Sequence, residues 1–192
     1  MKTLSKIFLV FAVIALFSCE EQLTELNVNP NGVDPSTVNP NLMVPTIITS
    51  SFDMYLKNGY DDRYAGVMQY VQKSGWGNEL NKLDWTAEQD WTGPYDVLRN
   101  AKHLYDRAGE EGMEFHQGVA IIIRANMFAR IADTWGDAPY TAALNAENGG
   151  QEDLFPKYDS QETIYKGIIE ELKQANTMLS KSVGDRSEEP HV

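Results

Sequence analysis

The stretch Ile131-Ala-Asp-Thr-Trp-Gly-Asp-Ala-Pro-Tyr-Thr-Ala-Ala-Leu144 marks where one helix ends and a long connection begins. Gly136 follows Trp135 directly, and glycine tolerates the positive φ of a helix C-terminal cap. Pro139 lacks a backbone N–H and its ring clashes with the preceding turn, so no helix continues through it. We therefore expect a helix that ends at Trp135 and an irregular connection over residues 136–158.

Apolar residues at helical spacing predict a helix on each side of this stretch. Upstream, residues 114–134 contain small alanines that let neighbouring helices approach closely. Downstream, Asp159-Ser-Gln-Glu162 resembles a capping box, with Asp159 as the expected acceptor for a first-turn amide. The helix that follows carries one apolar stripe and is expected to end at Gly184; the stripe consists of Ile164, Ile168, Leu172, Ala175 and Leu179.

Further upstream, the same periodicity predicts helices over residues 42–57, 60–73 and 93–108. In the first of these, Ile48 and Phe52 fall on the predicted apolar face. Residues 76–91 fit neither the helix nor the strand period, so we expect a loop. No strand pattern competes anywhere, and the chain is therefore predicted to be all-α, built from paired helices. The tetratricopeptide pattern fails around Trp91 and around Ala120, so the residues alone do not name the repeat.

The N-terminus reads as an export signal. Two lysines precede an apolar run, Ile7-Phe-Leu-Val-Phe-Ala-Val-Ile-Ala-Leu-Phe17, which is too short to cross a bilayer comfortably. Leu16-Phe-Ser-Cys19 resembles the lipobox of bacterial lipoproteins, in which the thiol is lipidated and the signal removed. The alternative is a free thiol behind an ordinary signal peptide. We expect a signal peptide over residues 1–18, lipid attachment at Cys19, a tether over 19–41 and a helical domain over 42–192.

The charge of the chain limits its partners. Residues 1–18 contain two lysines and no acidic residue, so their removal changes the formal net charge from −12 to −14. Nucleic-acid binding depends on neutralised phosphates, and an electrostatic hold on anionic lipid also needs basic residues. We therefore expect no nucleic-acid partner and a domain that is tethered outside the cell.

No motif of catalysis, metal binding or cofactor binding stands out. The three histidines have no helical metal-ligand spacing, and nucleophile elbows, phosphate loops and dinucleotide fingerprints are missing. Acidic pairs such as Asp61-Asp62 and Glu110-Glu111 are more typical of solvated faces than of a glycosidase dyad. We expect no catalytic residue, no metal ligand and no cofactor.

Tryptophan is the residue type that best suits a ligand site here. Trp76, Trp85 and Trp91 cluster in the predicted loop rather than on a periodic stripe. They either cap helix ends as part of the core or form a platform on which sugar rings stack, since flat rings pack against the C–H faces of pyranoses. We take them as the candidate ligand-binding residues.

Several segments together resemble one protein family. Asp133-Thr-Trp-Gly-Asp-Ala-Pro-Tyr-Thr-Ala-Ala143 is similar to the D-x-[WY]-G-D-x-P-Y-x-x-A motif of SusD/RagB-family outer-membrane lipoproteins, SusD-like branch. Pro156-Lys-Tyr-Asp-Ser-Gln-Glu-Thr-Ile-Tyr165 and Leu26-Asn-Val-Asn-Pro-Asn31 resemble other segments of that family, in the same order. The four prominent side chains of the first motif are expected to be a structural hallmark at a helix exit; they are Asp133, Trp135, Asp137 and Tyr140.

The resemblance implies a tetratricopeptide-like α-helical scaffold at the cell surface. It further implies a protein that binds glycans or similar nutrients and hands them to a SusC-like, TonB-dependent transporter of the outer membrane, without covalent chemistry. Members of the family are usually much longer, so we expect this chain to correspond to the N-terminal portion of a truncated scaffold. Two alternatives remain: a structural or adaptor lipoprotein without a ligand, and an all-α glycoside hydrolase that uses paired carboxylates.

Overall fold

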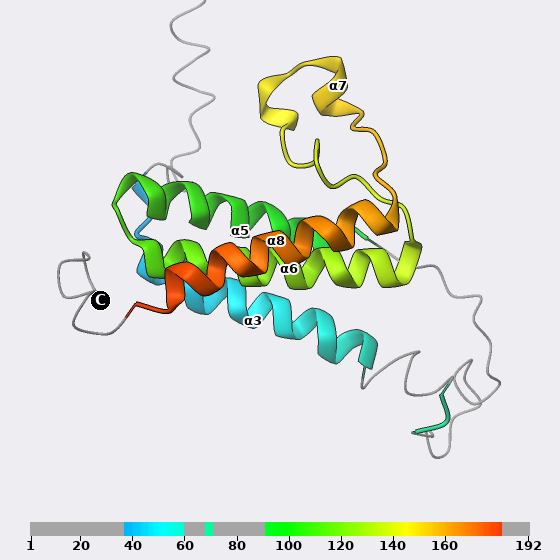
Figure 1. Cartoon of the computed structure of the whole chain (residues 1–192), viewed down its shortest axis with the longest axis horizontal. Helices are drawn as coiled ribbons and strands as arrows, with labels where there is room; N and C mark the ends of the chain where they lie inside the picture. The colour runs from blue at the N-terminus through cyan, green and yellow to red at the C-terminus, as the bar shows by residue number, and fades with distance from the viewer. Residues whose placement is uncertain (1–36, 60–67, 71–90, 182–192) are drawn as a thin grey trace, which may run out of the picture. The chain divides into compact units, whose positions relative to one another are not determined.

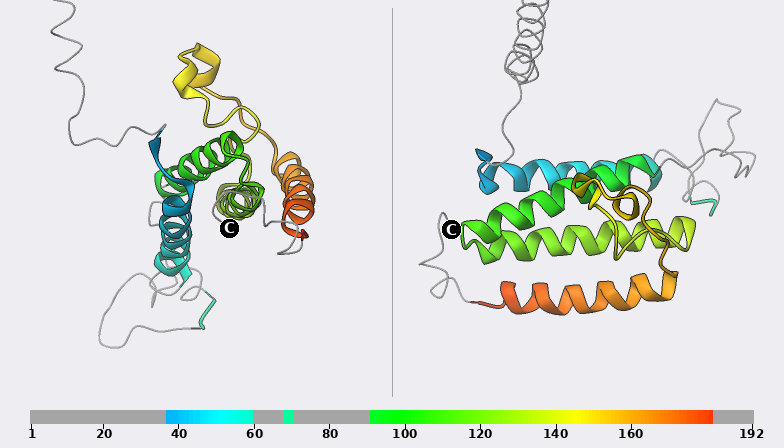
Figure 2. Two further views of the ribbon diagram at one scale, coloured as in Figure 1. Left: turned by 90° about the vertical axis from the view of Figure 1, so that its left-hand side faces the viewer. Right: turned by 90° about the horizontal axis from the view of Figure 1, so that it is seen from above.

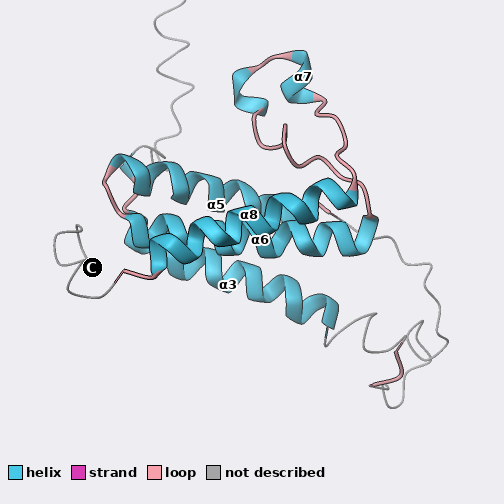
Figure 3. Cartoon of the chain, viewed as in Figure 1, coloured by secondary structure: helices cyan, strands magenta, loops and turns pink. Residues whose placement is uncertain are grey.

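The computed structural model describes residues 37–59, 68–70 and 91–181, and every helix in it belongs to the compact unit Val38–Val192. Its long helices are α3 (Pro40–Gly59), α5 (Thr92–Glu110), α6 (Glu114–Trp135) and α8 (Gln161–Leu179). Two short elements, η3 (Ala146–Asn148) and α7 (Gln151–Leu154), lie in the connection between α6 and α8. Figure 3 shows no strand in the described segments, which confirms the all-α prediction.

Helix α6 is the centre of the packing (Figures 1 and 2). It contacts α5, α8 and α3, and α5 also packs against α3, whereas α8 has extensive contacts only with α6 among the described elements. The small residues predicted in α6 explain this position, since Ala120, Ala125 and Ala132 are each almost fully buried. Short side chains at a helix interface allow the backbones to approach closely.

Large apolar side chains from the helices fill the core. Phe128 and Ile131 of α6 are fully buried, as are Leu98 and Leu104 of α5 and Ile164 of α8. Fully burying a side chain of this size stabilises the fold by about 1.5–3 kcal/mol. These few positions therefore supply much of the free energy that joins the helices.

The first helix differs from the prediction in length and in face. Helix α3 begins at Pro40 and ends at Gly59, and the buried positions among its described side chains are Pro40, Ile47 and Ser51. Ile48 and Phe52, which the pattern placed on the apolar face, are 38% and 64% exposed. The core face of α3 therefore lies one residue earlier along the helix than the pattern predicted, and Ile47 packs there into the core that α5 and α6 share with α3.

The predicted helix over residues 60–73 is wrong where the structure describes it. Residues 68–70 form a turn and a bend, and Gln69 has a φ of 60°. Such a φ lies in the left-handed region, so a right-handed helix does not run through this position. The remaining residues of that prediction lie outside the described segments, as do residues 76–90 of the predicted loop.

Candidate functional site

The connection between α6 and α8 closes where its two ends meet. Ala138 and Asp159 exchange both backbone hydrogen bonds: Ala138 N–H donates to Asp159 O at 3.1 Å and Asp159 N–H donates to Ala138 O at 3.0 Å. The loop of residues 139–158 is therefore pinned at its base, which fixes where it leaves α6 and where it enters α8.

The Asp159 carboxylate strengthens this closure. It accepts hydrogen bonds from the backbone N–H of Tyr140 at 3.2 Å and of Thr141 at 2.7 Å, and from the Thr141 hydroxyl at 2.9 Å. Partial burial opposes ionisation of Asp159, but these hydrogen bonds outweigh it and hold the pKa of the carboxyl below its ordinary value. Asp159 is thus a charged residue that organises the loop.

Asp137 and Gln161 cap the two helices reciprocally. Asp137 Oδ1 accepts from the backbone N–H of Gln161, the first residue of α8, at 3.0 Å. The Gln161 side chain donates back to Ala132 O near the end of α6 at 2.7 Å, and the same carbonyl accepts from Gly136 N–H at 2.9 Å. Gly136 has a φ of 78°, as the C-terminal cap requires.

The predicted start and end of the last helix need correction. The N-terminal cap of α8 is Ser160, whose hydroxyl accepts from Thr163 N–H at 3.2 Å, whereas Asp159 bonds to Tyr140 and Thr141 instead. Glu162 pairs with Lys166 along the exposed face. The helix ends at Leu179, and Gly184 lies outside the described residues. The stripe is buried at Ile164, Ile168 and Ala175, while Leu172 is 41% exposed.

Residues of the motif around Trp135 form hydrogen bonds with residues of α8. Besides Asp137, Tyr140 donates its hydroxyl to Glu171 Oε1 at 2.7 Å, and Tyr165 donates its hydroxyl to Asp133. Burial raises the pKa of Tyr140 above its ordinary value, and the bond to Glu171 adds to the increase. These contacts tie α6 and its exit turn to α8, which agrees with the expectation of a structural hallmark.

An aromatic cluster gathers at the end of the bundle where α5 begins and α6 ends. Trp91 stands directly before α5, and its ring centroid lies 5.9 Å from that of Trp135, 6.0 Å from that of Tyr158 and 5.8 Å from that of Tyr95. The Tyr95 hydroxyl donates to Pro139 O at 2.7 Å, and burial, with the nearby Tyr158 and Asp159, raises its pKa to about 12. We call Trp91, Trp135 and Tyr158 the aromatic platform.

Of the three candidate ligand residues, the structure describes one. Trp91 is half-buried in the aromatic platform, whereas Trp76 and Trp85 lie outside the described residues, as does Cys19. Two exposed aromatic residues escaped the sequence analysis: Tyr158 is 60% exposed and Phe155 is 75% exposed. They sit in an irregular connection, where no periodicity distinguishes a surface aromatic from a core one.

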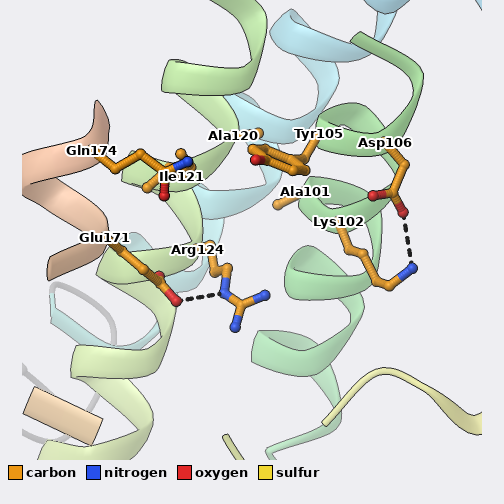
Figure 4. A pocket seen from close by; sticks show the side chains of 9 residues that line it. All are labelled: Ala101, Lys102, Tyr105, Asp106, Ala120, Ile121, Arg124, Glu171 and Gln174. Carbon is orange, nitrogen blue, oxygen red and sulfur yellow. Dashed lines mark hydrogen bonds and ion pairs between the residues drawn. The ribbon is translucent and has the colours of Figure 1, made fainter. Parts of the chain in front are cut away.

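The described helices line hollows along the bundle. One, of about 300 Å³, is formed by residues of α5, α6 and α8 and contains polar groups (Figure 4); its lining residues include Lys102, Tyr105, Arg124, Glu171 and Gln174. The other, of about 510 Å³, lies between α3 and α6 and is mainly apolar; its lining residues include Ile48, Phe52, Val119 and Ile122. Sequence reasoning missed both, because each needs side chains from separate helices.

The described segments hold no group of three or more His, Cys, Asp or Glu side chains that could bind a metal ion. None of the described helices combines the length with the apolar character that crossing a membrane requires.

Comparison with known proteins identifies the family. No curated protein matches the chain, and no solved structure does so. A SusD-like family model, described as "Starch-binding associating with outer membrane", matches residues 31–189. The match includes α3, α5, α6 and α8 and the whole connection between the last two helices. The chain therefore belongs to this SusD-like family.

Proposed function

We propose that this protein is a cell-surface lipoprotein that binds glycans or similar nutrients and delivers them to a TonB-dependent, SusC-like transporter in the outer membrane. The observation that carries the proposal is the match over residues 31–189 to a family described as starch-binding and associated with the outer membrane. The lipobox-like sequence that ends at Cys19 supports it, because the segment lies just before the matched region.

The aromatic platform suits glycan binding. Tyr158 offers an exposed ring that packs against Trp91 directly before α5, and Trp91 in turn packs against Trp135 at the end of α6. Aromatic rings bind the C–H face of a sugar through apolar contact, and a ring held by others needs little reordering when a ligand arrives. Asp159 and the paired ends of the connection hold the base of this loop in place. Trp76 and Trp85 remain candidates for the same role.

Tyr158 variants test the platform. Tyr158→Ala removes the exposed ring and should weaken oligosaccharide binding about tenfold. For comparison, a nucleobase stacked on one aromatic side chain contributes about 1–3 kcal/mol to binding. Tyr158→Phe keeps the ring and is the matched control, with affinity close to that of the unmodified protein. Calorimetric titration with maltoheptaose and other soluble oligosaccharides measures both. Equal affinities for the alanine and phenylalanine variants would show that the ring does not contact the glycan.

The membrane attachment has its own test. Acylation at Cys19 would hold the protein on the outer membrane, since each buried methylene contributes about 0.8 kcal/mol and several chains make the anchor stable. Cys19→Ala should move the protein from the membrane fraction to the soluble fraction, as measured by fractionation and immunoblotting. Ser18→Ala keeps the thiol and serves as the control. A Cys19→Ala protein that stays on the membrane would contradict lipid attachment at this residue.

A further inference from the structure

The middle of the connection between α6 and α8, residues 145–157, is a self-contained segment that we call the arm. It consists mainly of η3 and α7, which contact each other, and neither has extensive contacts with a long helix among the described elements. Within this described connection, no residue from Ala146 to Tyr158 is buried. In Figure 1 and in the left view of Figure 2, the arm projects away from the long helices. Because the arm adds no buried side chain to the core, it can change position without unfolding the bundle.

The arm begins at a strained residue. Leu144 packs against the core with its side chain, and its backbone has a φ of 67°. A residue with a side chain rarely adopts this left-handed conformation, and it does so only where the surrounding structure imposes it. The direction in which the arm leaves the core is therefore set at Leu144, and a change of its backbone angles would release strain. This position has the properties of a hinge.

An ion pair joins the arm to α5. Lys102 Nζ lies 3.3 Å from Glu147 Oε1, and the Glu147 side chain is 75% exposed. Lys102 also pairs with Asp106, on its own helix, at 2.9 Å. When Glu147 moves away, Asp106 keeps the ammonium group paired, so the separation leaves no buried charge. Exposed ion pairs stabilise a structure only slightly, and this one therefore holds the arm weakly.

The arm exposes apolar side chains close to the aromatic platform. Phe155 is the most exposed phenylalanine of the described segments, at 75%, and its neighbour Leu154 is 53% exposed. Phe155 precedes Tyr158 by only three residues. The Tyr158 ring packs against Trp91, with 6.0 Å between the ring centroids, but it is still 60% exposed. Two exposed aromatic rings are therefore joined by a short piece of chain.

The length of this piece suits a sugar ring between Phe155 and Tyr158. Three residues of extended chain span at most about 10 Å. A sugar that contacts an aromatic ring on each face, with carbon–carbon distances of about 3.5–4.0 Å, places the two aromatic rings about 7–8 Å apart. The chain can bridge this separation. Pro156 lies between the two residues and restricts the backbone, which lowers the entropy that is lost when the rings are brought into place.

We propose that the arm closes over a glycan on the aromatic platform, and that Phe155 then contacts the sugar face opposite to Tyr158. Closure changes the backbone at Leu144 and separates Glu147 from Lys102. The exposed ring of Phe155 is removed from water by the C–H groups of the sugar, so the closed position is favoured when the ligand is present. The inference rests on the proposed glycan binding and adds Phe155 as a second ligand-contacting ring.

Calorimetric titration of the full-length protein, in a detergent without a sugar headgroup, tests the role of Phe155. The probes are maltoheptaose, cellohexaose and xylohexaose. For each oligosaccharide that the unmodified protein binds, Phe155→Ala should weaken the affinity about tenfold, as loss of one stacked ring does. Phe155→Tyr keeps the ring and should preserve the affinity. Leu154→Ala is the control for an exposed apolar side chain in the same arm and should change the affinity little. Circular dichroism melting shows whether each variant is folded.

Glu147→Gln tests the open position. It removes the ion pair that closure must break, so it should tighten oligosaccharide binding about two- to fivefold, the factor expected from an exposed pair. The probes are uncharged, and the lost charge therefore has no direct effect on them. Glu152→Gln removes another exposed charge of the arm and is the control. Hydrogen exchange followed by mass spectrometry measures closure itself, since saturating oligosaccharide should slow amide exchange over residues 150–157.

The proposal fails if Phe155→Ala binds as tightly as the unmodified protein. It also fails if Glu147→Gln does not tighten binding, or if exchange over residues 150–157 is the same with and without oligosaccharide. In each of these cases, binding by the unmodified protein would still support the proposed function. An unmodified protein that binds none of the three oligosaccharides would overturn both.

Discussion

At the scale of single residues, Asp159 is the side chain on which the loop geometry depends most. Its carboxylate accepts two backbone N–H groups and one hydroxyl from the other end of the connection. Asp159→Ala leaves these donors without their acceptor and should lower the free energy of unfolding by about 1.5–3 kcal/mol. Denaturation in urea measures the change. Asp96→Ala is the control, since the ion pair of Asp96 with Arg99 is exposed and its loss should change stability little.

The same carboxylate should make stability depend on pH. Its hydrogen bonds lower the pKa of Asp159 in the folded state below its ordinary value of 3.8, so its stabilising effect is complete well above that value. The effect is lost as the pH falls through the lowered pKa of the folded state. The difference in unfolding free energy between the unmodified protein and Asp159→Asn should therefore be largest above about pH 5 and should shrink as the pH falls from about 4 towards about 2. A difference that stays constant over this range would rule out this role of the charge.

Sequence reasoning identified residues that act locally and missed those that act across the fold. The helix end at Gly136 and Pro139 was predictable from the sequence, because the effect of each residue depends on its own backbone conformation. Asp159 was misassigned as the α8 cap, since its partners Tyr140 and Thr141 lie 19 and 18 residues away. The Arg124–Glu171 pair and the Trp91–Tyr158 contact were missed for the same reason, because each joins residues that are far apart in the sequence. Such pairings need the packed arrangement of the helices.

At the scale of elements, Gly167 controls how closely the Tyr140 turn approaches α8. A Cβ added at Gly167 would lie 2.7 Å from Tyr140 Cζ and closer still to its hydroxyl. Tyr140 is almost fully buried and is bonded to Glu171, one helical turn further along α8, so its ring cannot move aside freely. Glycine is required here although it is a poor helix former.

The substitution Gly167→Ala therefore has two opposite effects on the stability of the protein. Helix propensity alone would stabilise α8 by about 1 kcal/mol. The collision with Tyr140 should outweigh this and destabilise the protein by about 1–3 kcal/mol, as overpacking generally does. Asn176→Ala, on an exposed position of the same helix, is the control and should be slightly stabilising. Thermal unfolding compares the two, and a Gly167→Ala protein that melts higher than the unmodified one would refute the close packing.

The positions of the helices were largely predictable, but their faces were less so. Residues 93–108 and 114–134 were expected to be helical, and α5 and α6 extend only slightly beyond them. For α3 the buried face was shifted by one residue, because the sequence does not show from which side α5 and α6 approach. The turn at Met68–Tyr70 was missed since the apolar spacing around it mimics a helix, while its deciding feature is the positive φ of Gln69.

At the scale of the whole unit, several large apolar side chains of the described helices are exposed. Phe52 is 64% exposed, Ile122 is 41% exposed and Ile48 is 38% exposed, and all three line the hollow between α3 and α6. Ile169 and Leu172 of α8 are also exposed, at 51% and 41%. Exposed apolar surface gathered in one place is typical of interaction sites and promotes association.

Residues 20–192 should therefore bind a hydrophobic dye or self-associate when purified without detergent. Replacing Phe52 and Ile122 by lysine should reduce dye fluorescence and association, with little loss of stability because neither side chain is buried in the core. Analytical ultracentrifugation and dye titration measure these effects. Lysine at Met43, which packs against the core, is the contrasting substitution and should destabilise the fold. A monodisperse monomer that binds no dye would contradict the prediction.

We propose that this SusD-like chain binds glycans without altering them. Isothermal titration calorimetry of residues 20–192 against a panel of soluble oligosaccharides, including maltoheptaose, tests it most directly. The result we predict is saturable heat with at least one oligosaccharide, with affinity weakened about tenfold in Tyr158→Ala and kept in Tyr158→Phe, and with the oligosaccharide recovered intact by chromatography. An absence of binding across the panel would favour an adaptor without a ligand, and the release of shorter sugars would favour a hydrolase; either result would contradict the claim.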